Sequence, residues 1–342
     1  MSSATDTIMA PQAEQKAAAL EVRALCKYFS LGGTFALHKS LLRAVDDVNF
    51  VLRPGRVTAL VGESGSGKST VARLLVRLYQ PTHGTILFRG RDVTHIRGPA
   101  AMRHYRSQVQ MIFQDPFGSL NPVKRIEHHL ARPLLVHGIA SRKNVHEKVI
   151  ELLETVGLIP PEEIARKYPH QLSGGQQQRV GIARALAVQP TVLLADEPIS
   201  MLDVSIRIGI LNLMLDLKEK KDIAFLYVTH DIASARYLAD EMLVMYAGQI
   251  VEQAPTDEVL HHPLHPYTDL LLSAVPDPEA GLRHEKKLPA REDRQLPFDH
   301  PGCRFADRCA LAIDSCFVDG PLLLEVRPGH FVRCPVVDVS TK

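Results

Sequence analysis

Tryptophan is absent from this chain, and so is an excess of charge of either sign. The 342 residues carry 40 basic and 38 acidic side chains, which gives a formal net charge of +2. An almost neutral chain has no general attraction to nucleic acid, so we expect no nucleic acid among its partners. No apolar run approaches the ~20 residues that a membrane-spanning helix needs. Residues 1–19 lack the basic start and apolar core of a secretory signal, which favours a cytoplasmic chain.

Cysteine is also scarce. Only five cysteines occur, and four of them fall within the last 40 residues.

The rest of the composition is typical of a globular protein, with 45% hydrophobic and 23% charged residues. Such a chain can bury a substantial core and is not disordered throughout. By length alone, about two domains of roughly 150 residues are expected.

Apolar runs separated by turn signals organise the first half of the chain. Residues 1–19 are rich in Ala, Ser, Thr and Gln without periodicity, which predicts a disordered tail. Short β-branched runs predict strands at 45–52, 57–61, 85–88 and 109–113, with one helix at 69–79 before Pro81 and Gly84. Residues 121–172 then change character, because 127–137 and 144–156 show helical spacing of apolar residues.

A second α/β stretch follows this helical insertion. Helices are expected at 175–187 and 205–220, and strands at 191–195, 223–228, 242–245 and 249–252. This alternation favours a largely parallel sheet. Beyond Pro255 the chain is rich in proline and irregular. We therefore expect a tail at 1–19, an α/β domain at 20–255 with a helical subdomain at about 115–172, and a small irregular C-terminal lobe at 256–342.

A glycine-rich motif at positions 62–69 predicts a phosphate-binding loop. It reads GESGSGKS, matches G-x-x-x-x-G-K-[ST], and lies between the strand at 57–61 and a helix start. Its backbone N–H groups and the helix N-terminus favour phosphate. Lys68 would contact the β- and γ-phosphates, and the Ser69 hydroxyl would ligate Mg²⁺. The expected nucleotide contacts are Gly62, Glu63, Ser64, Gly65, Ser66, Gly67, Lys68, Ser69 and Thr70.

Two adjacent carboxylates follow the apolar strand at 191–195. Asp196 is suited to contact Mg²⁺ and its waters, and Glu197 is suited to polarise the water that attacks the γ-phosphate. A strand that ends in Asp-Glu is a weak indication alone, because such pairs also occur for structural reasons. Its position about 130 residues after a phosphate-binding loop strengthens the prediction.

A second helix start is predicted to bind an anion. Ser173 is suited as its N-cap, and Gly174 and Gly175 leave backbone N–H groups exposed before Gln176. One chain thus carries two helix termini that favour phosphate, which is more than one nucleotide requires. We therefore expect a dimer in which the loop of one subunit and the Ser-Gly-Gly of the other hold the same nucleotide.

In this order, the motifs resemble those of the ATP-binding subunits of ABC transporters, over about residues 20–252. The resemblance implies a P-loop ABC ATPase cassette, with a mixed α/β sheet and a helical subdomain, that binds ATP and Mg²⁺. It implies that Phe29, or alternatively Tyr28, stacks on adenine. It also implies that Gln114 contacts Mg²⁺ and relays movement to the membrane subunits.

Two further positions are assigned by the same resemblance. Asp203 lies in the loop that would cross the dimer interface, where Met201 replaces the usual alanine. His230 follows a strand and resembles the histidine that contacts the γ-phosphate. The catalytic set implied by the resemblance is Glu197, His230, Lys68 and Gln114.

The C-terminal region resembles the oligopeptide/dipeptide branch of this family at 262–268 and 271–276. The residues alone predict only a helix at 267–274 between prolines. His261, His262 and His265 could suggest a metal site, but the neighbouring prolines prevent a common helical face, so we favour no metal there.

The four late cysteines leave three interpretations open. They are Cys303, Cys309, Cys316 and Cys334, with five, six and seventeen residues between them. Disulfides are disfavoured in a reducing cytosol, and the close C-x₂₋₄-C pairs typical of zinc sites are absent. The stretch resembles the C-terminal region of peptide-transporter ATPases, some of which bind a [4Fe–4S] cluster, so the resemblance implies these four as its ligands. Zinc and unliganded thiols remain alternatives, while Cys26 is expected to be a small buried residue.

The resemblance also implies function and partners. By this resemblance, the chain would be an ATP-hydrolysing subunit at the cytoplasmic face of the membrane that powers uptake of oligopeptides or dipeptides. The partners would be a second ABC ATPase, two transmembrane permease subunits and an extracytoplasmic solute-binding protein. Positions 44–48, 72–75 and 113–122 resemble the second member of an unequal ATPase pair. Import of another solute, such as an oligosaccharide or nickel, is the near alternative, and a soluble ABC ATPase without membrane partners is the more distant one.

Overall fold

The computed structural model describes residues 17–31, 40–273 and 301–337, and their strands form two sheets. Most of the predicted tail at 1–19 therefore lies outside the described residues. The larger sheet has eight strands in the order β11-β12-β10-β9-β3-β8-β7-β6. Its strands are β3 (Val57–Val61), β6 (Val109–Ile112), β7 (Val192–Asp196), β8 (Ala224–Thr229), β9 (Glu241–Tyr246), β10 (Gln249–Pro255), β11 (Leu324–Arg327) and β12 (His330–Val332).

The larger sheet is mixed. Strands β6, β7, β8, β3 and β9 run parallel to one another, whereas β10 pairs antiparallel with β9, and β12 and β11 continue the sheet antiparallel. Every residue of β3, β7 and β8 is buried, as strands with both faces covered require. The mixed α/β sheet expected from the sequence is confirmed, and the predicted runs match these strands to within a few residues.

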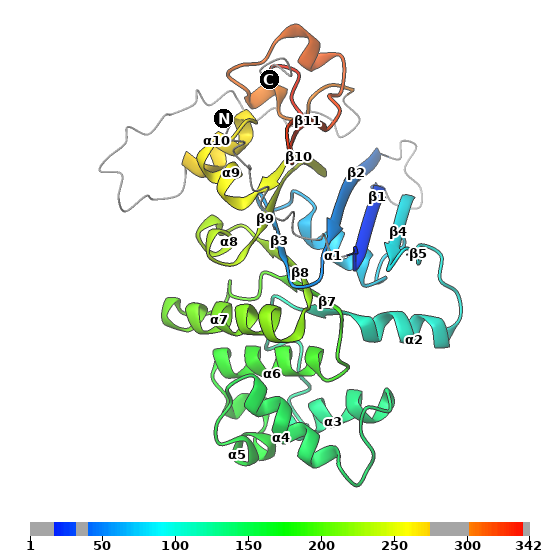
Figure 1. Ribbon diagram of the computed structural model, residues 1–342, viewed down its shortest axis with the longest axis vertical. Coiled ribbons are helices and arrows are strands. Elements are labelled where there is room, and N and C mark those ends of the chain that lie inside the picture. The colour runs from blue at the N-terminus through cyan, green and yellow to red at the C-terminus, as the bar shows by residue number, and fades with distance from the viewer. Residues whose placement is uncertain (1–16, 32–39, 274–300, 338–342) are drawn as a thin grey trace, which may run out of the picture.

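The smaller sheet is antiparallel, in the order β2-β1-β4-β5. Its strands are β1 (Leu20–Leu31), β2 (Ser40–Leu52), β4 (His83–Phe88) and β5 (Arg91–Asp92). It lies beside α1 (Lys68–Leu75) in Figure 1, and buried residues of both belong to one hydrophobic cluster that includes Leu20, Val45 and Leu74. Helix α1 ends earlier than the predicted 69–79, because Arg77 already has a left-handed backbone, with a φ of 60°.

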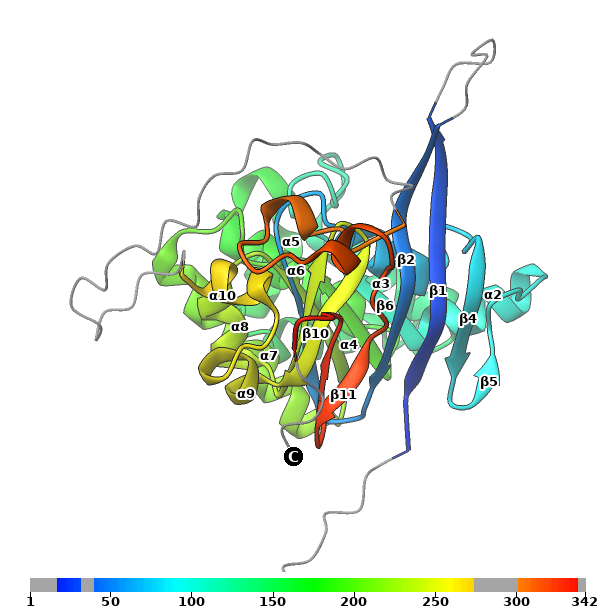
Figure 2. The same ribbon diagram turned by 90° about the horizontal axis from the view of Figure 1, so that it is seen from above.

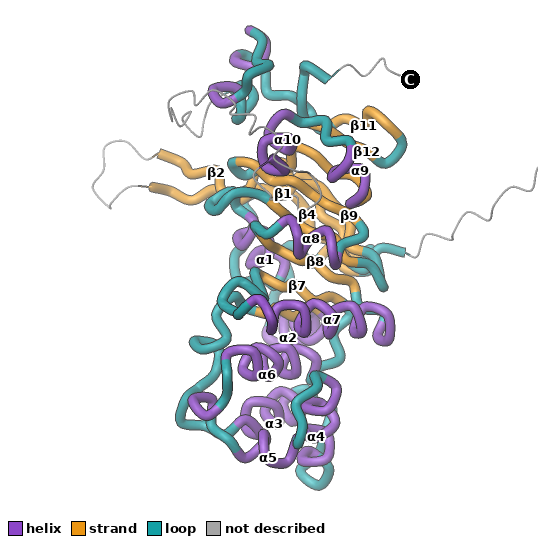
Figure 3. Tube along the Cα trace, turned by 90° about the vertical axis from the view of Figure 1, so that its left-hand side faces the viewer, coloured by secondary structure: helices purple, strands orange, loops and turns teal. Residues whose placement is uncertain are grey.

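Helices cover the sheets and form one end of the molecule. Helices α3, α4 and α5 gather at the end opposite the C-terminal lobe, with α6 packed between them and α7 (Figures 1 and 3). The helices besides α1 are α2 (Pro99–Gln108), α3 (Ile126–Val136), α4 (Val145–Thr155), α5 (Pro161–Arg166), α6 (Gly174–Leu186), α7 (Val204–Lys221), α8 (Ile232–Leu238), α9 (Thr256–His261) and α10 (Pro266–Ser273). Within the described part of the chain, no helix combines the length and apolarity needed to span a membrane.

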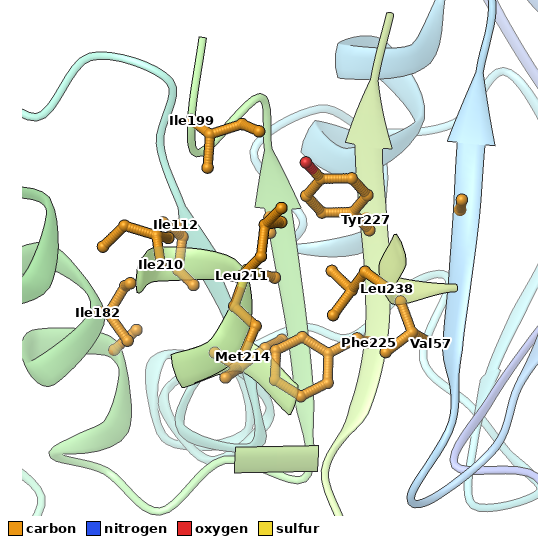
Figure 4. Close-up of a cluster of buried hydrophobic side chains, with 14 of the residues drawn as sticks. Val57, Ile112, Ile182, Ile199, Ile210, Leu211, Met214, Phe225, Tyr227 and Leu238 are labelled. Carbon is orange, nitrogen blue, oxygen red and sulfur yellow. The ribbon is translucent and has the colours of Figure 1, made fainter. Parts of the chain in front are cut away.

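The core between α6, α7 and the sheet fixes the strand ends that carry the site. Figure 4 shows Ile182 of α6 and Ile210 of α7 gathered beside Ile112, at the end of β6. On β8, Phe225 and Tyr227 are fully buried in the same cluster. Burying a side chain of this size contributes about 1.5–3 kcal/mol. The polar residues that follow β7 and β8 are therefore anchored by rigid strands.

The described part of the C-terminal lobe contains two short strands, β11 and β12. Strand β12 pairs with β10, Glu252 lying opposite Val332, and β11 pairs with β12, so the lobe extends the main sheet. Glu252 is fully buried and accepts hydrogen bonds from the backbone N–H of His265 at 2.9 Å and from the ring of His330 at 2.7 Å. These bonds connect β10, α10 and β12.

Candidate nucleotide-binding site

The glycine-rich loop closes tightly against neighbouring backbone between β3 and α1. Gly67 has a φ of 105°, and a Cβ atom there would lie 2.2 Å from the carbonyl oxygen of Ala44. At Gly62, with a φ of 149°, a Cβ atom would lie 2.1 Å from the carbonyl oxygen of Met245. Only glycine fits both the conformation and the space at these positions. The loop therefore has the shape of a backbone cradle for phosphate.

Lys68 is folded into this loop. Its Nζ donates hydrogen bonds to the carbonyl oxygens of Gly62 at 2.8 Å and Glu63 at 2.7 Å. Burial lowers the pKa of Lys68, while the nearby carboxylates of Glu197, Asp196 and Glu63 act in the opposite direction. A buried ammonium held by backbone oxygens is well placed to exchange these partners for phosphate oxygens.

Ser69 and Asp196 meet across the site. The hydroxyl of Ser69, on the first turn of α1, donates to Oδ1 of Asp196 at 2.8 Å. Asp196 ends β7, and burial raises its pKa above the usual range. A hydroxyl and a carboxylate are hard oxygen donors of the kind that Mg²⁺ prefers, so these residues fit the expected cation.

Glu197 lies between two other predicted residues. Its Oε2 accepts a hydrogen bond from Nε2 of Gln114 at 2.9 Å, and its Oε1 lies 3.1 Å from Nδ1 of His230. Glu197 itself has a left-handed φ of 47°, and its N–H donates to the carbonyl of Val228. Gln114, Glu197 and His230 follow β6, β7 and β8, so three adjacent parallel strands deliver them to one edge of the sheet.

The Ser-Gly-Gly motif lies at the start of α6. Ser173 caps the helix by accepting from the N–H of Gln176 at 3.3 Å, and the Gln176 side chain accepts from the N–H of Ser173 at 3.1 Å. A Cβ atom on Gly175 would lie 2.5 Å from Ile206 of α7, which explains the need for glycine there. Asp203 stands at the N-cap position of α7 without a side-chain capping bond. Among the described residues, no hydrogen bond or ion pair connects Ser173, Gly174 or Asp203 to the phosphate-binding loop.

The two candidate aromatic residues have different surroundings. The hydroxyl of Tyr28 donates to Oδ1 of Asp46 at 2.6 Å. Phe29 is half-buried and meets Tyr79 edge-to-face, with ring centroids 5.6 Å apart. The ammonium of Lys27 also lies 5.1 Å from the centroid of the Phe29 ring. The assignment of Phe29, or alternatively Tyr28, as the adenine contact stays a prediction.

The late cysteines lie close together in the C-terminal lobe. Cys303, Cys309 and Cys316 are buried, and the N–H of Cys303 donates to the carbonyl of Cys316 at 2.7 Å. Burial raises the pKa of Cys303 to about 11, and the thiols of Cys316, Cys334 and Cys309 add to the rise. Within residues 17–31, 40–273 and 301–337, however, no group of three or more His, Cys, Asp or Glu is arranged to hold a metal ion. The geometry thus gives no support to the expected iron–sulfur cluster.

Sequence reasoning missed one group of contacts at the loop. The guanidinium of Arg308 forms two hydrogen bonds with the carboxylate of Glu63, at 3.0 and 3.1 Å. The N–H of Glu63 also donates to the hydroxyl of Tyr267 at 2.9 Å. These partners lie more than 200 positions apart in the sequence, and no local pattern relates them.

Comparisons with known proteins agree with this geometry. A family model described as "ABC transporter" matches residues 45–200, and one described as "Oligopeptide/dipeptide transporter, C-terminal region" matches residues 251–316. The oligopeptide transport ATP-binding protein AppF of Bacillus subtilis (strain 168) is 42% identical over 318 residues, which cover 92% of this chain and 96% of that protein.

Solved structures show the same likeness. The ATP-binding cassette MJ0796, in a dimeric post-hydrolysis state bound to ADP and Pi, is 28% identical with a TM-score of 0.61, over 69% of this chain and 98% of that one. The protein cbiO1 from Clostridium perfringens, part of the ABC transporter complex cbiONQ, is 26% identical with a TM-score of 0.61, over 72% of this chain and 92% of that one. This chain therefore belongs to the ABC transporter family of ATP-binding proteins.

Proposed function

We propose that this chain is the ATP-hydrolysing subunit of an importer of oligopeptides or dipeptides. The observation that carries the proposal is the combination of two parts: the Gln114–Glu197–His230 cluster beside the phosphate-binding loop, and a C-terminal region that matches the oligopeptide/dipeptide transporter model at 251–316. The relative AppF is named as an oligopeptide transport ATP-binding protein, which supports the same cargo.

The proposed hydrolysis uses the residues in the places described. The loop N–H groups and Lys68 hold the β- and γ-phosphates, while Ser69 and Asp196 would hold Mg²⁺, which neutralises charge on the phosphate oxygens when bound. Glu197 accepts a hydrogen bond from the attacking water and polarises it. Gln114 and His230 hold the two oxygens of this carboxylate and thereby orient it.

A complete site is proposed to need two cassettes. Ser173 caps α6 and Asp203 is at the N-cap position of α7, and among the described residues no hydrogen bond joins either of them to the loop of the same chain. Backbone N–H groups at a helix start favour the γ-phosphate of a nucleotide held by a partner cassette. The likeness to a dimeric ATP-binding cassette supports this arrangement. The partner is proposed to be a second, different ABC ATPase, with a homodimer as the alternative.

The remaining partners follow from transport. The chain would lie at the cytoplasmic face of the membrane, bound to two transmembrane permease subunits that receive cargo from an extracytoplasmic solute-binding protein. Exposed Phe117 and Val123, before α3, are suited to contact a permease loop. The alternatives are import of an oligosaccharide or nickel by the same machinery and, more distantly, a soluble ABC ATPase without membrane partners.

Deletion of the gene tests the cargo. A strain without this chain should lose growth on oligopeptides or dipeptides as sole amino-acid source, while its growth on sugars and its nickel uptake stay unchanged. Recovery of the tagged chain with membranes supports the permease partners. Growth on peptides at the parental rate, or recovery of the chain only with ribosomes or DNA, would contradict the proposal.

We also propose that Cys303, Cys309, Cys316 and Cys334 hold an iron–sulfur cluster. The support is the chemistry of the residues, because three buried thiols and a half-buried fourth are soft ligands of the kind that such a cluster takes, although their described positions do not form a preorganised metal site. When bound, it would cross-link a lobe with a small core of its own. Purification without oxygen should give a brown protein that contains iron. A colourless, iron-free chain, or one that contains zinc, would contradict this.

A further inference from the structure

The outer side of the phosphate-binding loop is held by the C-terminal lobe. From here on the lobe means its described residues 301–337, which Figure 2 shows beside α10 and over β10. Its short helix at Ala306–Arg308 brings Arg308 to Glu63, the second residue of the loop, and two parallel hydrogen bonds join the side chains at 3.0 and 3.1 Å. Paired bonds of this kind fix direction as well as distance. Arg308 therefore defines where the side chain of Glu63 lies.

The position of Glu63 matters because its backbone touches the catalytic lysine. The carbonyl oxygen of Glu63 accepts a hydrogen bond from Lys68 Nζ at 2.7 Å. Its N–H donates to the hydroxyl of Tyr267, on α10, at 2.9 Å. Glu63 is thus bound on three sides: by the lobe, by α10 and by the lysine that contacts phosphate. A displacement of Glu63 would move Lys68 and the backbone cradle together.

Arg308 is itself held in place. Its guanidinium lies 5.7 Å from the ring centroids of both Tyr246 and Phe305, and it donates to the Tyr246 hydroxyl at 3.3 Å. The rings of Tyr246, Tyr267 and Phe305 pack together, with centroids 4.6–5.5 Å apart. Phe305 and Tyr267 are almost completely buried. A rigid aromatic cluster therefore supports the arginine, and little side-chain freedom is lost when it pairs with Glu63.

A second arginine of the lobe reaches the same loop through the turn between β9 and β10. Arg304 donates to the carbonyl of Ala247 and to Oδ2 of Asp46. The next residue, Gly248, donates its N–H to the carbonyl of Ser66 at 2.8 Å. Asp46 also binds Tyr28, the neighbour of Phe29. Both ends of the expected nucleotide site are therefore connected to the lobe.

We propose that Arg308 is a positioning residue for ATP, through which the C-terminal lobe holds Glu63 and Lys68 of the phosphate-binding loop in the binding conformation. The effect falls on nucleotide affinity, because the side-chain hydrogen bonds of Arg308 go to Glu63 of the loop and to Tyr246, and among the described residues none joins it to Glu197. This inference rests on the ATP site alone and does not depend on the transported solute.

The test compares Arg308→Gln, Glu63→Gln and the double variant, each in the full-length chain. ATP dissociation constants come from binding titrations, and KM and kcat from the assembled transporter. We expect Arg308→Gln to weaken ATP binding about 3- to 10-fold and to raise KM more than it changes kcat. The double variant should bind ATP no more weakly than the weaker-binding of the two single variants, because each single substitution already removes the same interaction.

Two controls separate positioning from general damage. Arg327→Gln removes an exposed arginine of the same lobe and should bind ATP like the parent chain. Arg308→Lys keeps the charge but loses the paired geometry, so it should restore part of the affinity. Unchanged ATP affinity in Arg308→Gln, a loss confined to kcat, or additive losses in the double variant would each overturn the proposal. If Arg308→Gln does not fold, Arg308→Lys and Glu63→Gln give the same comparison.

Discussion

Oε1 of Glu197 lies 3.1 Å from Nδ1 of His230. The amide of Gln114 binds the other oxygen of the same carboxylate at 2.9 Å. Both partners follow strands that are parallel to β7, so the arrangement is a property of the sheet. The carboxylate is therefore oriented by two side chains, and hydrolysis should depend on them.

We first predict that His230→Ala lowers kcat by about 10²- to 10⁴-fold, because an unoriented Glu197 cannot place the water. ATP affinity should change much less, since the loop and Lys68 are untouched. Steady-state ATPase assays of the assembled transporter, together with ATP titrations, measure both quantities. His261→Ala is the matched control, because His261 is exposed on α9. Equal kcat values for the two variants would contradict this function of His230.

A second prediction concerns the shape of the loop. Gly67→Ala would place a Cβ atom 2.2 Å from the carbonyl of Ala44 at a φ of 105°, so the loop must shift and ATP binding should be lost. Gly90→Ala is the control, because Gly90 also has a positive φ, of 75°, but has open space around it. That variant should bind ATP like the parent. Normal ATP affinity in Gly67→Ala would show that the loop does not need this conformation.

The third prediction is a pH dependence of stability that comes from His265. Burial lowers its pKa to about 4 in the folded chain, against about 6.5 when unfolded. The unfolded chain therefore binds the proton first, and stability is lost as the pH falls from 6.5 towards 4. At pH 5 this loss amounts to about 2 kcal/mol relative to pH 7.5.

Denaturant titrations at pH 7.5 and pH 5 measure this effect. His265→Asn should lower the free energy of unfolding at pH 7.5, because a buried group is replaced. Between pH 7.5 and pH 5, however, the free energy of unfolding should fall less in this variant than in the parent chain. An identical decrease in parent and variant would place the pH dependence elsewhere. His262→Asn, which changes an exposed histidine three residues away, should leave the parental pH dependence intact.

The sequence predicts the parts of this fold that are encoded locally. The strand at Val57–Val61 and the cap at Ser173 agree with expectation because apolar runs, glycines and N-cap residues act within a few positions. Helix α2 has Tyr105 as its one buried residue, so it has no apolar stripe by which to predict it. Strands β11 and β12 are short and β11 is mostly exposed, so they too lack the pattern by which a strand is predicted.

In the candidate site, too, some residues could be predicted from the local sequence and others could not. Glu197 could be named from the sequence because it follows an apolar strand, whereas Gln114 and His230 could be named because their motifs resemble those of a known family. The pairing of Arg308 with Glu63 could not, because 245 positions separate the two residues and only the packed aromatic cluster brings them together. The hydrogen bond from Tyr28 to Asp46 could not be predicted either, because the two residues lie on different strands, β1 and β2.

The most direct test of the account is Glu197→Gln in the assembled transporter. Glutamine has nearly the same shape but cannot polarise water as a carboxylate does, so hydrolysis should fall at least ~10²-fold while ATP affinity is retained. Glu219→Gln, an exposed change on α7, should leave both values at the parental level. Turnover in Glu197→Gln close to that of the parent would contradict the assignment of Glu197 as the catalytic carboxylate.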